Sequence, residues 1–322
     1  MQLEAIRALV QEDLEATDKF IISRLESDIP LINNMVQYIL TCGGKRIRPM
    51  ILLLSARACN PNTHHHIDLA AIIELVHTAT LLHDDVVDNS TLRRGHKTAH
   101  TIWGNEASVL VGDFLYSRSF QVVVALKIER ILEIFSFATH YIAEGEILQL
   151  MNCKNPDTTE EFYTDIIQRK TAKLFEVAAQ FGGVITSSPE PLIQAMRQYG
   201  LHLGMAYQLI DDALDYNQPA EQTGKNVGND LADGKTTLPL IYALRHCGPA
   251  EAVLLRGAIQ AGSSEHLTDI ITIIESTGAI QYTAATAKQY AQKAQAALSC
   301  IPASPYRDAL HELANFVVDR TY

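Results

Sequence analysis

The sequence predicts an all-α fold, and three observations support that prediction. No proline lies in residues 62–155, 157–188 or 192–218, and since proline inside a helix costs about 3 kcal/mol, these stretches can hold long helices. Apolar residues recur there at helical spacing, in LAAIIELVHTATLLH, FQVVVALKIERILEIFSFATHYIAEGEILQL and FYTDIIQRKTAKLFEVAAQF. Alternating, strand-like runs between turn signals are scarce.

Residues that disfavour helices mark the expected boundaries, at 41–44, 60–62, 155–157 and 187–191. Pro49 and Pro239 fit the first turn of a following helix. We expect roughly a dozen helices, many of them apolar on most sides and therefore central in a bundle. From about Gly248 onward the pattern indicates further amphipathic helices without a chemical motif.

Length, composition, net charge and cysteine content restrict the possible functions of the protein. An apolar fraction of 47% in 322 residues suffices for a sizeable core, and without an evident linker we expect a single domain over 1–322. The net charge of −11 gives no support to nucleic-acid binding. Five cysteines without a C-x-x-C pair indicate a reduced, cytosolic protein. The N-terminus has no secretory pattern, and no apolar run reaches the ~18 residues of a membrane span.

Three carboxylates end an apolar stretch in LLHDDVVDNSTLRRG, residues 81–95. Each helical residue advances by 100°, so Asp84, Asp85 and Asp88 share an arc of about 100°. Tracing back along the same face adds His77 and Glu74 to this stripe. The chain therefore concentrates negative charge at the end of an apolar helix.

A second cluster, LIDDALDY at residues 209–216, repeats this arrangement. Asp211, Asp212 and Asp215 share one arc, with Gln208 on the same face. Like charges one turn apart repel, and more strongly when partly buried, so two such clusters indicate a bound cation. Oxygen-only ligands favour Mg²⁺ or a similar hard ion, which is typically shared with substrate phosphates. The sequence thus predicts a phosphate-bearing substrate between two helices.

The aspartate motifs and the histidines also allow other interpretations. One DDxxD motif could be a solvated face, although two that each end an apolar helix fit this less well. Glu74 and His77 form an E-x-x-H motif, as in di-iron bundles, but the second motif that such a site needs is missing. His77 by itself is equally compatible with a core histidine. We expect the histidine run at 64–66 to be solvated or to bind metal adventitiously.

An acidic chain must hold an anion with local basic clusters, because its overall field repels one. GGKRIRP, residues 43–49, places Lys45 and Arg48 on one face of a helix start, where the dipole favours an anion. Arg93 and Arg94 form a second pair, and the arginine fork suits phosphate. Further basic positions are Lys170 beside Thr171, and Lys225 and Lys235. Any one of them could be a plain surface charge; together they indicate an anion site.

The polar segment 216–235 directly follows the second aspartate cluster and has no periodicity. A loop of this length in a compact domain is usually functional or disordered. We expect it to act as a lid.

These motifs together resemble the trans-isoprenyl diphosphate synthases. GGKRIRP, ELVHTATLLHDDVVDNSTLRRG, KT, QLIDDALDY and GKNVGNDLADGKTTLPL follow the order and spacing of that family from about residue 43 to 240. Two DDxxD motifs with GGKxxRP make the resemblance specific, and it is strongest to bacterial members that make an octaprenyl product. It implies a bundle of long helices around a deep central cavity, usually in a homodimer.

The resemblance also implies roles. Six aspartates would hold Mg²⁺ on the allylic diphosphate and serve catalysis: Asp84, Asp85, Asp88, Asp211, Asp212 and Asp215. The same diphosphate would contact Arg93, Lys170, Thr171, Gln208, Lys225 and Lys235, and the three lysines would also serve catalysis. Isopentenyl diphosphate would be held by Lys45, Arg48, His77 and Arg94. Glu146 and Gln149 occupy positions of further polar cavity residues, to which we assign no role.

The implied reaction agrees with the composition. Ionisation of the allylic C–O bond builds negative charge on the leaving diphosphate, which Mg²⁺ and fixed cations stabilise. The double bond of isopentenyl diphosphate attacks the allylic cation and a proton is lost, with diphosphate as the expected base. No enzyme nucleophile is needed, and the sequence has no Ser-His-Asp or Cys-His pattern. We expect a cytoplasmic enzyme that starts from farnesyl diphosphate and passes its product to membrane enzymes for the ubiquinone side chain.

We expect product length to depend on Ala79 and Thr80, about one turn before Asp84. An aromatic residue there would block a product tunnel early, whereas Ala and Thr leave it open. The first motif also lacks a two-residue insertion of many short-chain relatives. The expected product is octaprenyl, with heptaprenyl, nonaprenyl and geranylgeranyl as alternatives.

Three other functional classes share part of the pattern. A terpene cyclase would use Mg²⁺ and an aspartate motif, but it needs no isopentenyl site, and GGKRIRP argues against it. A non-catalytic subunit of a heteromeric synthase usually loses aspartates, and both clusters are intact here. A Mg²⁺-dependent binding protein without turnover is the third.

Overall fold

The computed structural model describes residues 2–217 and 227–319, and this part of the chain is largely helical, as the sequence predicts. Contacts divide the chain into two compact units. The first unit comprises residues 1–136, 177–197 and 298–313, and the second comprises 137–176, 198–297 and 314–322. The single domain expected over residues 1–322 stays a prediction.

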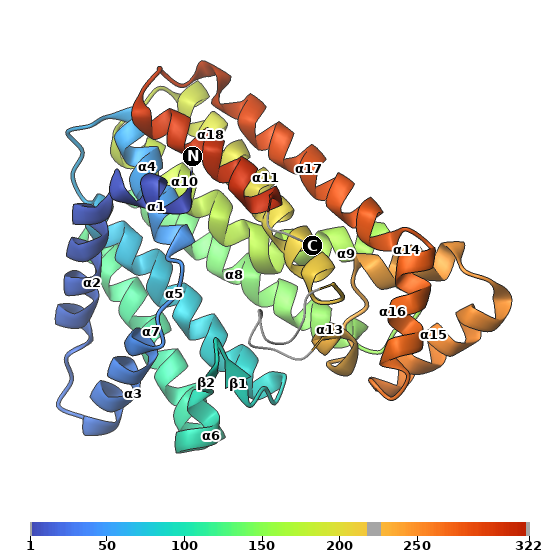
Figure 1. The fold of residues 1–322 in the computed structure, drawn as a ribbon. Helices are drawn as coiled ribbons and strands as arrows, with labels where there is room; N and C mark the ends of the chain where they lie inside the picture. Colours follow the sequence, from blue (N-terminus) through green and yellow to red (C-terminus); the bar gives the residue numbers. More distant parts are fainter. Residues whose placement is uncertain (1, 218–226, 320–322) are drawn as a thin grey trace. The chain divides into compact units, whose positions relative to one another are not determined.

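The first unit contains the N-terminal helices and the hairpin, and one short turn from the C-terminal part of the chain (Figure 1). They are α1 (Leu3–Ala8), α2 (Gln11–Leu25), α3 (Pro30–Thr41), α4 (Ile47–Cys59), α5 (His66–Val87), β1 (Leu92–Arg93), β2 (His96–Lys97), α6 (Ala99–Trp103) and α7 (Asn105–Ala125), and the 3₁₀ turn η2 (Leu298–Cys300).

The second unit contains α9 (Glu160–Ile167), the π-helical turn η1 (Gln168–Ala172), α13 (Asn229–Ala232), α14 (Leu238–His246), α15 (Pro249–Ala261), α16 (Leu267–Ser276) and α17 (Ala279–Ala297). Four helices contribute residues to both units: α8 (Glu129–Asn152), α10 (Lys173–Ile185), α11 (Glu190–Leu214) and α18 (Pro305–Val318).

Helices α4 and α5 are central in the first unit, as their apolar pattern predicts. Nearly every side chain of α4 is buried, and α5 packs against α2, α4 and α7 (Figure 1). One core cluster of this unit includes Met35, Leu75, Ala79, Leu82 and Val111. The end of α5, where the first aspartates lie, is therefore anchored in a packed core.

A separate core cluster stabilises the second unit. Tyr216, Leu231, Leu240, Ile259 and Ile274 belong to it. Helix α14 contacts α15, α16 and α17 around this cluster. The first residue after the second aspartate motif, Tyr216, is thereby fixed in the core.

Most expected boundaries are confirmed. Helix α3 ends at Thr41, and gaps follow α4, α8 and α10 where the sequence predicts them. Pro49 and Pro239 lie in the first turns of α4 and α14, and helices α15–α18 follow Gly248 as expected. The described residues hold more helices than the expected dozen, because several are only one or two turns long.

Three local features differ from the expectation. The apolar stretch 120–150 is two helices, broken where Lys127 takes a left-handed backbone (φ 55°). The short antiparallel hairpin β1–β2 follows the first aspartate cluster. The segment 216–235 contains the one-turn helix α13, while its residues 218–226 lie outside the described part of the chain.

The expectation that the histidine run is solvated is wrong for His66. This side chain is buried at the start of α5, with Nε2 3.3 Å from Asp13 Oδ1. Arg57 donates from Nε to Asp13 Oδ2 at 2.9 Å and from Nη2 to Oδ1 at 2.7 Å. The three side chains thus join α2, α4 and α5, a long-range cluster that the local sequence does not reveal.

None of the five cysteines forms a disulfide. Among the helices of the described residues, none combines the length and apolar composition needed to cross a membrane.

The Asp13 cluster predicts a pH-dependent contribution to stability. Burial by itself raises the pKa of Asp13, but hydrogen bonds from His66 and Arg57 outweigh it and lower the pKa from 3.8 to about 2. This difference corresponds to about 2 kcal/mol, present above pH 3.8 and lost as the pH falls through about 2. Asp13→Asn should lower the free energy of unfolding by that amount at pH 7, measured by urea denaturation.

The matched control is Asp308→Asn, which changes an exposed aspartate paired with Arg307 in the same unit. Its effect should stay within about 0.5 kcal/mol. Equal stability of Asp13→Asn and wild type at pH 7 would contradict the contribution of this cluster.

Candidate functional site

The first aspartate motif lies at the C-terminal end of α5, where Asp88 caps the helix. Asp85 is buried and accepts a hydrogen bond from Arg93 Nε at 2.7 Å. Asp84 and Asp88 are only partly buried. Burial raises the pKa of Asp85, while the neighbouring Arg93 acts in the opposite direction. The motif therefore has one carboxylate engaged by arginine and two more accessible ones.

The β1–β2 hairpin positions the two arginines that follow. Arg94 and Gly95 both have positive φ, 54° and 78°, which is typical of a two-residue type I′ turn. Arg93 pairs with His96 across the hairpin and reaches back to Asp85. Arg94, at the turn, extends to a different partner on the loop between α3 and α4.

That partner is the glycine pair of GGKRIRP. Arg94 Nη1 donates a hydrogen bond to the carbonyl oxygen of Gly43. A Cβ added at Gly44 would lie 2.5 Å from Arg94 Nη1, so a larger residue there would displace the guanidinium from its present position. In the first turn of α4, Arg48 Nη1 lies 3.1 Å from His77 Nε2. The structure thus brings together Arg48, His77 and Arg94 in the first unit.

His77 is surrounded by positive charge. Burial, together with Arg48, Arg94, Arg93 and Arg46, holds its pKa well below the usual value. The imidazole is therefore neutral, and its Nε2 can accept the hydrogen bond from Arg48. Its polar partner distinguishes it from an ordinary core histidine.

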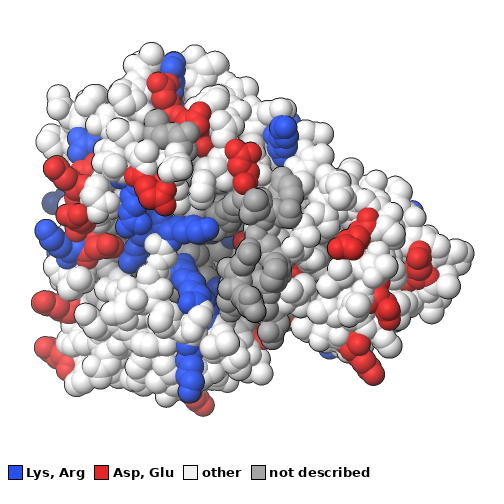
Figure 2. Space-filling model, viewed as in Figure 1, with Lys and Arg blue, Asp and Glu red and all other residues white. Residues whose placement is uncertain are grey.

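The basic residues border a pocket of the first unit. Tyr38, Cys42, Arg93, Arg94 and Lys97 are among its lining residues. The hydroxyl of Tyr38 donates to the carbonyl oxygen of Lys97 at 2.7 Å and so attaches the hairpin to α3. Figure 2 shows Lys and Arg side chains gathered on this face, over α5 and the hairpin. An anion is the ligand that such a surface attracts.

The second aspartate motif, at the end of α11, has the same division of roles. Asp211 is exposed, whereas Asp212 is buried. Asp212 accepts hydrogen bonds from Tyr163 Oη at 2.5 Å and from Gln208 Nε2 at 2.7 Å. Asp215 is partly exposed, and its Oδ2 accepts the backbone N–H of Asp230 at 3.0 Å.

Burial makes the charged forms of this second cluster costly. The pKa values of Asp212 and Tyr163 are both raised well above their usual ranges, in each case first by burial. The phenol of Tyr163 therefore stays protonated, and its O–H donates a hydrogen bond to Asp212. Thr171 extends this network, because its Oγ1 donates to Gln208 Oε1 at 2.8 Å.

Lys170 and Thr171 lie in the π-helical turn η1 between α9 and α10. Such turns frequently occur at functional sites. A Cβ at Gly145 of α8 would lie 2.8 Å from the backbone nitrogen of Lys170, so this glycine allows the close approach. Lys170 Nζ bonds to Glu146 Oε2 and, at 2.7 Å, to Gln149 Oε1. Glu146 and Gln149, which had no assigned role, thus orient a predicted site lysine.

The remaining predicted residues are placed as follows. Lys235 Nζ lies 3.0 Å from Asp233 Oδ2 in the second unit. Lys225 lies outside the described residues. Ala79 is fully buried in the core cluster of the first unit, and Thr80 Oγ1 donates to the carbonyl oxygen of His77 at 2.9 Å. Within 2–217 and 227–319, no three His, Cys, Asp or Glu side chains already form a metal-binding group.

Sequence patterns miss two of the contacts that shape the site. Tyr163 lies on α9, 49 positions from its partner Asp212, and no spacing rule links the two. Arg46 pairs with Glu74 of α5, 28 positions away. Glu74 does stand out in the E-x-x-H motif, but the motif by itself points to a metal rather than to an arginine.

Comparisons with known proteins agree with the motifs. Residues 29–276 match the family model described as polyprenyl synthetase. The octaprenyl diphosphate synthase of Escherichia coli (strain K12) is 48% identical over 321 residues, covering 99% of each chain. The all-trans-nonaprenyl-diphosphate synthase (geranyl-diphosphate specific) of Rhodobacter capsulatus is 43% identical over 98% of this chain and 97% of its own.

The fold is likewise similar to a solved structure. The polyprenyl synthase from Caulobacter crescentus CB15, crystallised in complex with calcium and isoprenyl diphosphate, has a TM-score of 0.95 and 42% identity. The match covers 99% of this chain and 98% of that chain.

The buried bond between Tyr163 and Asp212 yields a stability prediction. Tyr163→Phe leaves one oxygen of a buried carboxylate without its donor, which should cost about 1–3 kcal/mol. Tyr290→Phe, which changes a half-buried tyrosine on α17, is the matched control and should shift stability by no more than about 0.5 kcal/mol. Urea denaturation measures both. If the two variants were equally stable, the Tyr163–Asp212 bond would not stabilise the second motif.

Proposed function

This chain belongs to the polyprenyl synthetase family, and from that premise we propose that it lengthens an allylic diphosphate by repeated trans condensation with isopentenyl diphosphate. It is a transferase of prenyl groups. The observation that carries the proposal is the grouping of Arg48, His77 and Arg94 in the unit that also holds the Asp84–Asp88 motif. A diphosphate needs such cations, and an acidic protein must gather them locally.

We propose octaprenyl diphosphate as the product and farnesyl diphosphate as the primer. The 48% identity to the Escherichia coli octaprenyl diphosphate synthase over the whole chain supports this choice. The 43% identity to the Rhodobacter capsulatus nonaprenyl enzyme makes a nonaprenyl product the next candidate, ahead of heptaprenyl and geranylgeranyl. The product would serve as the side chain of ubiquinone after transfer to membrane enzymes. The five cysteines, none of which forms a disulfide, support a cytoplasmic location.

A divalent cation fits the aspartates. Asp84 and Asp88 offer oxygen ligands one turn apart, and neither is fully buried. Hard cations that keep their waters prefer such ligands, so we propose Mg²⁺, bound by the six aspartates of both motifs. Asp84, Asp88, Asp211 and Asp215 are less buried than Asp85 and Asp212, and therefore suit direct ligation of a hydrated cation better. A bound cation would neutralise charge that develops on the leaving diphosphate.

The protein side chains have separate tasks in this proposal. Lys45, Arg48 and Arg94 supply positive charge for isopentenyl diphosphate, and neutral His77 orients Arg48 through its Nε2. Arg93 compensates Asp85 and leaves part of its guanidinium for the allylic diphosphate. In the second unit, Lys170, Thr171, Gln208, Lys225 and Lys235 would bind the allylic diphosphate. Arg93 and Lys170 are already oriented by protein partners, so they would stabilise the developing diphosphate charge without reorganisation.

We also propose that the enzyme acts as a homodimer. On α7, Leu110 and Val124 are exposed by 66% and 56%. On α8, Phe137 and Met151 are exposed by 64% and 79%. Large apolar side chains that are this exposed on long helices favour association with a second copy.

Turnover of the purified protein tests the proposed function. With Mg²⁺, farnesyl diphosphate and labelled isopentenyl diphosphate, we expect an octaprenyl diphosphate product, identified by chromatography against length standards. EDTA should abolish turnover, and Asp84→Asn should lower kcat about a hundredfold or more, as for loss of one electrostatic stabiliser. A cyclic hydrocarbon, or no product, would contradict the proposal and support a cyclase or a binding protein.

Product length should respond to residue 79. Ala79 has no side chain beyond Cβ and is enclosed by the core cluster of α5 and its neighbours. If the growing chain passes this position, Ala79→Tyr should shorten the product by several isoprene units, and Ala79→Val should have a smaller effect. Chromatography of the products measures both. A folded Ala79→Tyr enzyme with an unchanged product would remove residue 79 from the tunnel wall.

A further inference from the structure

Arg46, the middle basic residue of GGKRIRP, has no place in the reaction described above. Its backbone is left-handed (φ 50°), and it caps the start of α4 between Lys45 and Ile47. Its guanidinium turns away from solvent: Nη1 donates to Glu74 Oε1, and Nη2 lies 3.3 Å from Asp18 Oδ1. Only 12% of the Arg46 side chain is exposed. A partly buried arginine that already pairs with two carboxylates therefore serves the protein rather than the ligand.

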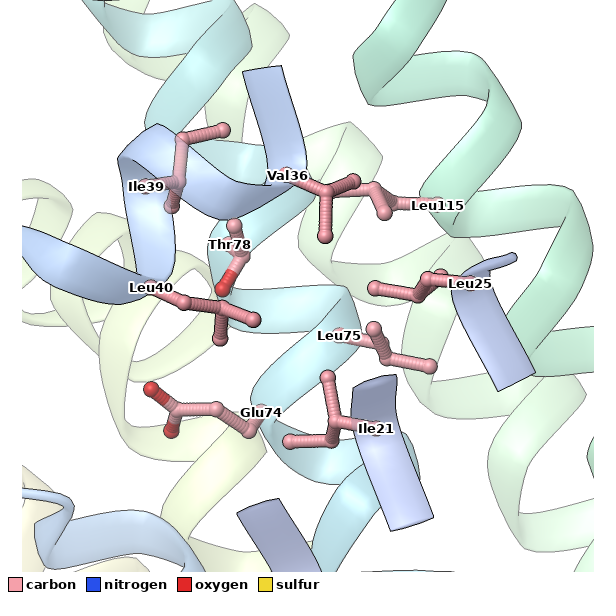
Figure 3. Close-up of a pocket in the computed structure, with 9 residues that line it drawn as sticks. All are labelled: Ile21, Leu25, Val36, Ile39, Leu40, Glu74, Leu75, Thr78 and Leu115. Carbon is pink, nitrogen blue, oxygen red and sulfur yellow. The ribbon is translucent and has the colours of Figure 1, made fainter. Parts of the chain in front are cut away.

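Its partner Glu74 is in an unusual place for a carboxylate. Only 7% of its side chain is exposed. Figure 3 shows it as the one acidic side chain in a pocket otherwise lined by Thr78 and the apolar residues Ile21, Leu25, Val36, Ile39, Leu40, Leu75 and Leu115. An ionised carboxylate among apolar side chains is costly unless it is paired. Arg46 supplies the pairing charge, so each residue fixes the other.

The position of this pair on α5 links it to the diphosphate site. Glu74 and His77 are three residues apart and so lie on one face, about one turn from each other. Arg46 and Arg48 contact these two residues in the same order. Residues 43–49, which include the first turn of α4, are therefore attached to α5 at two points, and Lys45 and Arg48 lie on either side of Arg46 in the sequence.

We propose that the Arg46–Glu74 ion pair is a positioning device, which sets the direction of Lys45 and Arg48 for the capture of isopentenyl diphosphate. The inference rests on the proposed function of this site. The pair is not among the residues assigned to either diphosphate in the proposed function, and the printed partners of Arg46 are the protein carboxylates of Glu74 and Asp18. Its loss should therefore impair isopentenyl diphosphate binding selectively, because a displacement of about 1 Å is costly for an oriented phosphate contact.

The test compares Glu74→Gln, Arg46→Met and the double variant. In assays with farnesyl diphosphate, each single change should raise KM for isopentenyl diphosphate about tenfold or more, with KM for farnesyl diphosphate and kcat changed less than about threefold. The double variant should have a KM for isopentenyl diphosphate no higher than that of Arg46→Met, since both changes break the same Arg46–Glu74 ion pair. Arg46→Lys, which keeps the charge, should recover part of the loss.

Asp13→Asn is the matched control, because it breaks another buried ion pair of the first unit, away from the loop. It should lower stability and leave both KM values unchanged. Titration calorimetry with isopentenyl diphosphate alone gives a second readout that needs no turnover. Glu74→Gln should weaken this binding by the same factor as KM.

The outcomes separate the two claims. A wild-type protein without turnover overturns the proposed function, and the titration still tests the role of the pair. A folded Glu74→Gln enzyme with unchanged isopentenyl diphosphate binding, or with both KM values raised equally, overturns the positioning role. If Glu74→Gln does not fold, Glu74→Asp and Arg46→Lys replace it, with the same expected selectivity at smaller amplitude.

Discussion

The site depends on the pairing of charges that are withdrawn from water. Asp85 with Arg93, Glu74 with Arg46, and Lys170 with Glu146 each combine a mostly buried group with an opposite charge. An unpaired charge in such a place would be strongly destabilising, so each partner must stay where it is. The requirement for pairing, rather than the energy that any one pair contributes, gives these flexible side chains fixed positions.

This requirement explains why each aspartate motif has unequal members. The middle aspartates, Asp85 and Asp212, point toward protein donors, and the first and last stay accessible at least in part. Three adjacent carboxylates facing solvent would repel one another and spread apart. Arg93 pairs with the middle aspartate in one unit, and Tyr163 and Gln208 hydrogen-bond the middle aspartate in the other, so in our proposal the less buried outer carboxylates face the cation. The carboxylates are thereby oriented by folding, before the substrate binds.

The sequence predicts those parts of the site that depend on one helix at a time. The 100° rule places Asp84 beside Asp88 and Gln208 beside Asp212, and both neighbourhoods are present in the structure. Contacts between distant segments do not follow from periodicity. His66 bonds to Asp13, 53 positions away, and Tyr163 reaches Asp212 across 49 positions. The break at Lys127 is also hidden, because apolar spacing continues through it and only the left-handed backbone ends the helix.

The E-x-x-H motif of α5 shows why spacing alone leaves chemistry undecided. Three-residue spacing puts Glu74 and His77 on one face, and this holds for a metal site and for a pair of anchors alike. The facing helix start decides between them, since a site that offers arginines to both side chains favours ion pairing and excludes a cation by repulsion. Arg46 pairs with the carboxylate of Glu74, and Arg48 contacts the imidazole of His77. Burial and the neighbouring arginines, Arg46 and Arg48 among them, lower the pKa of His77. A motif that suggests metal binding in the sequence thus anchors residues 43–49, for which we propose diphosphate binding.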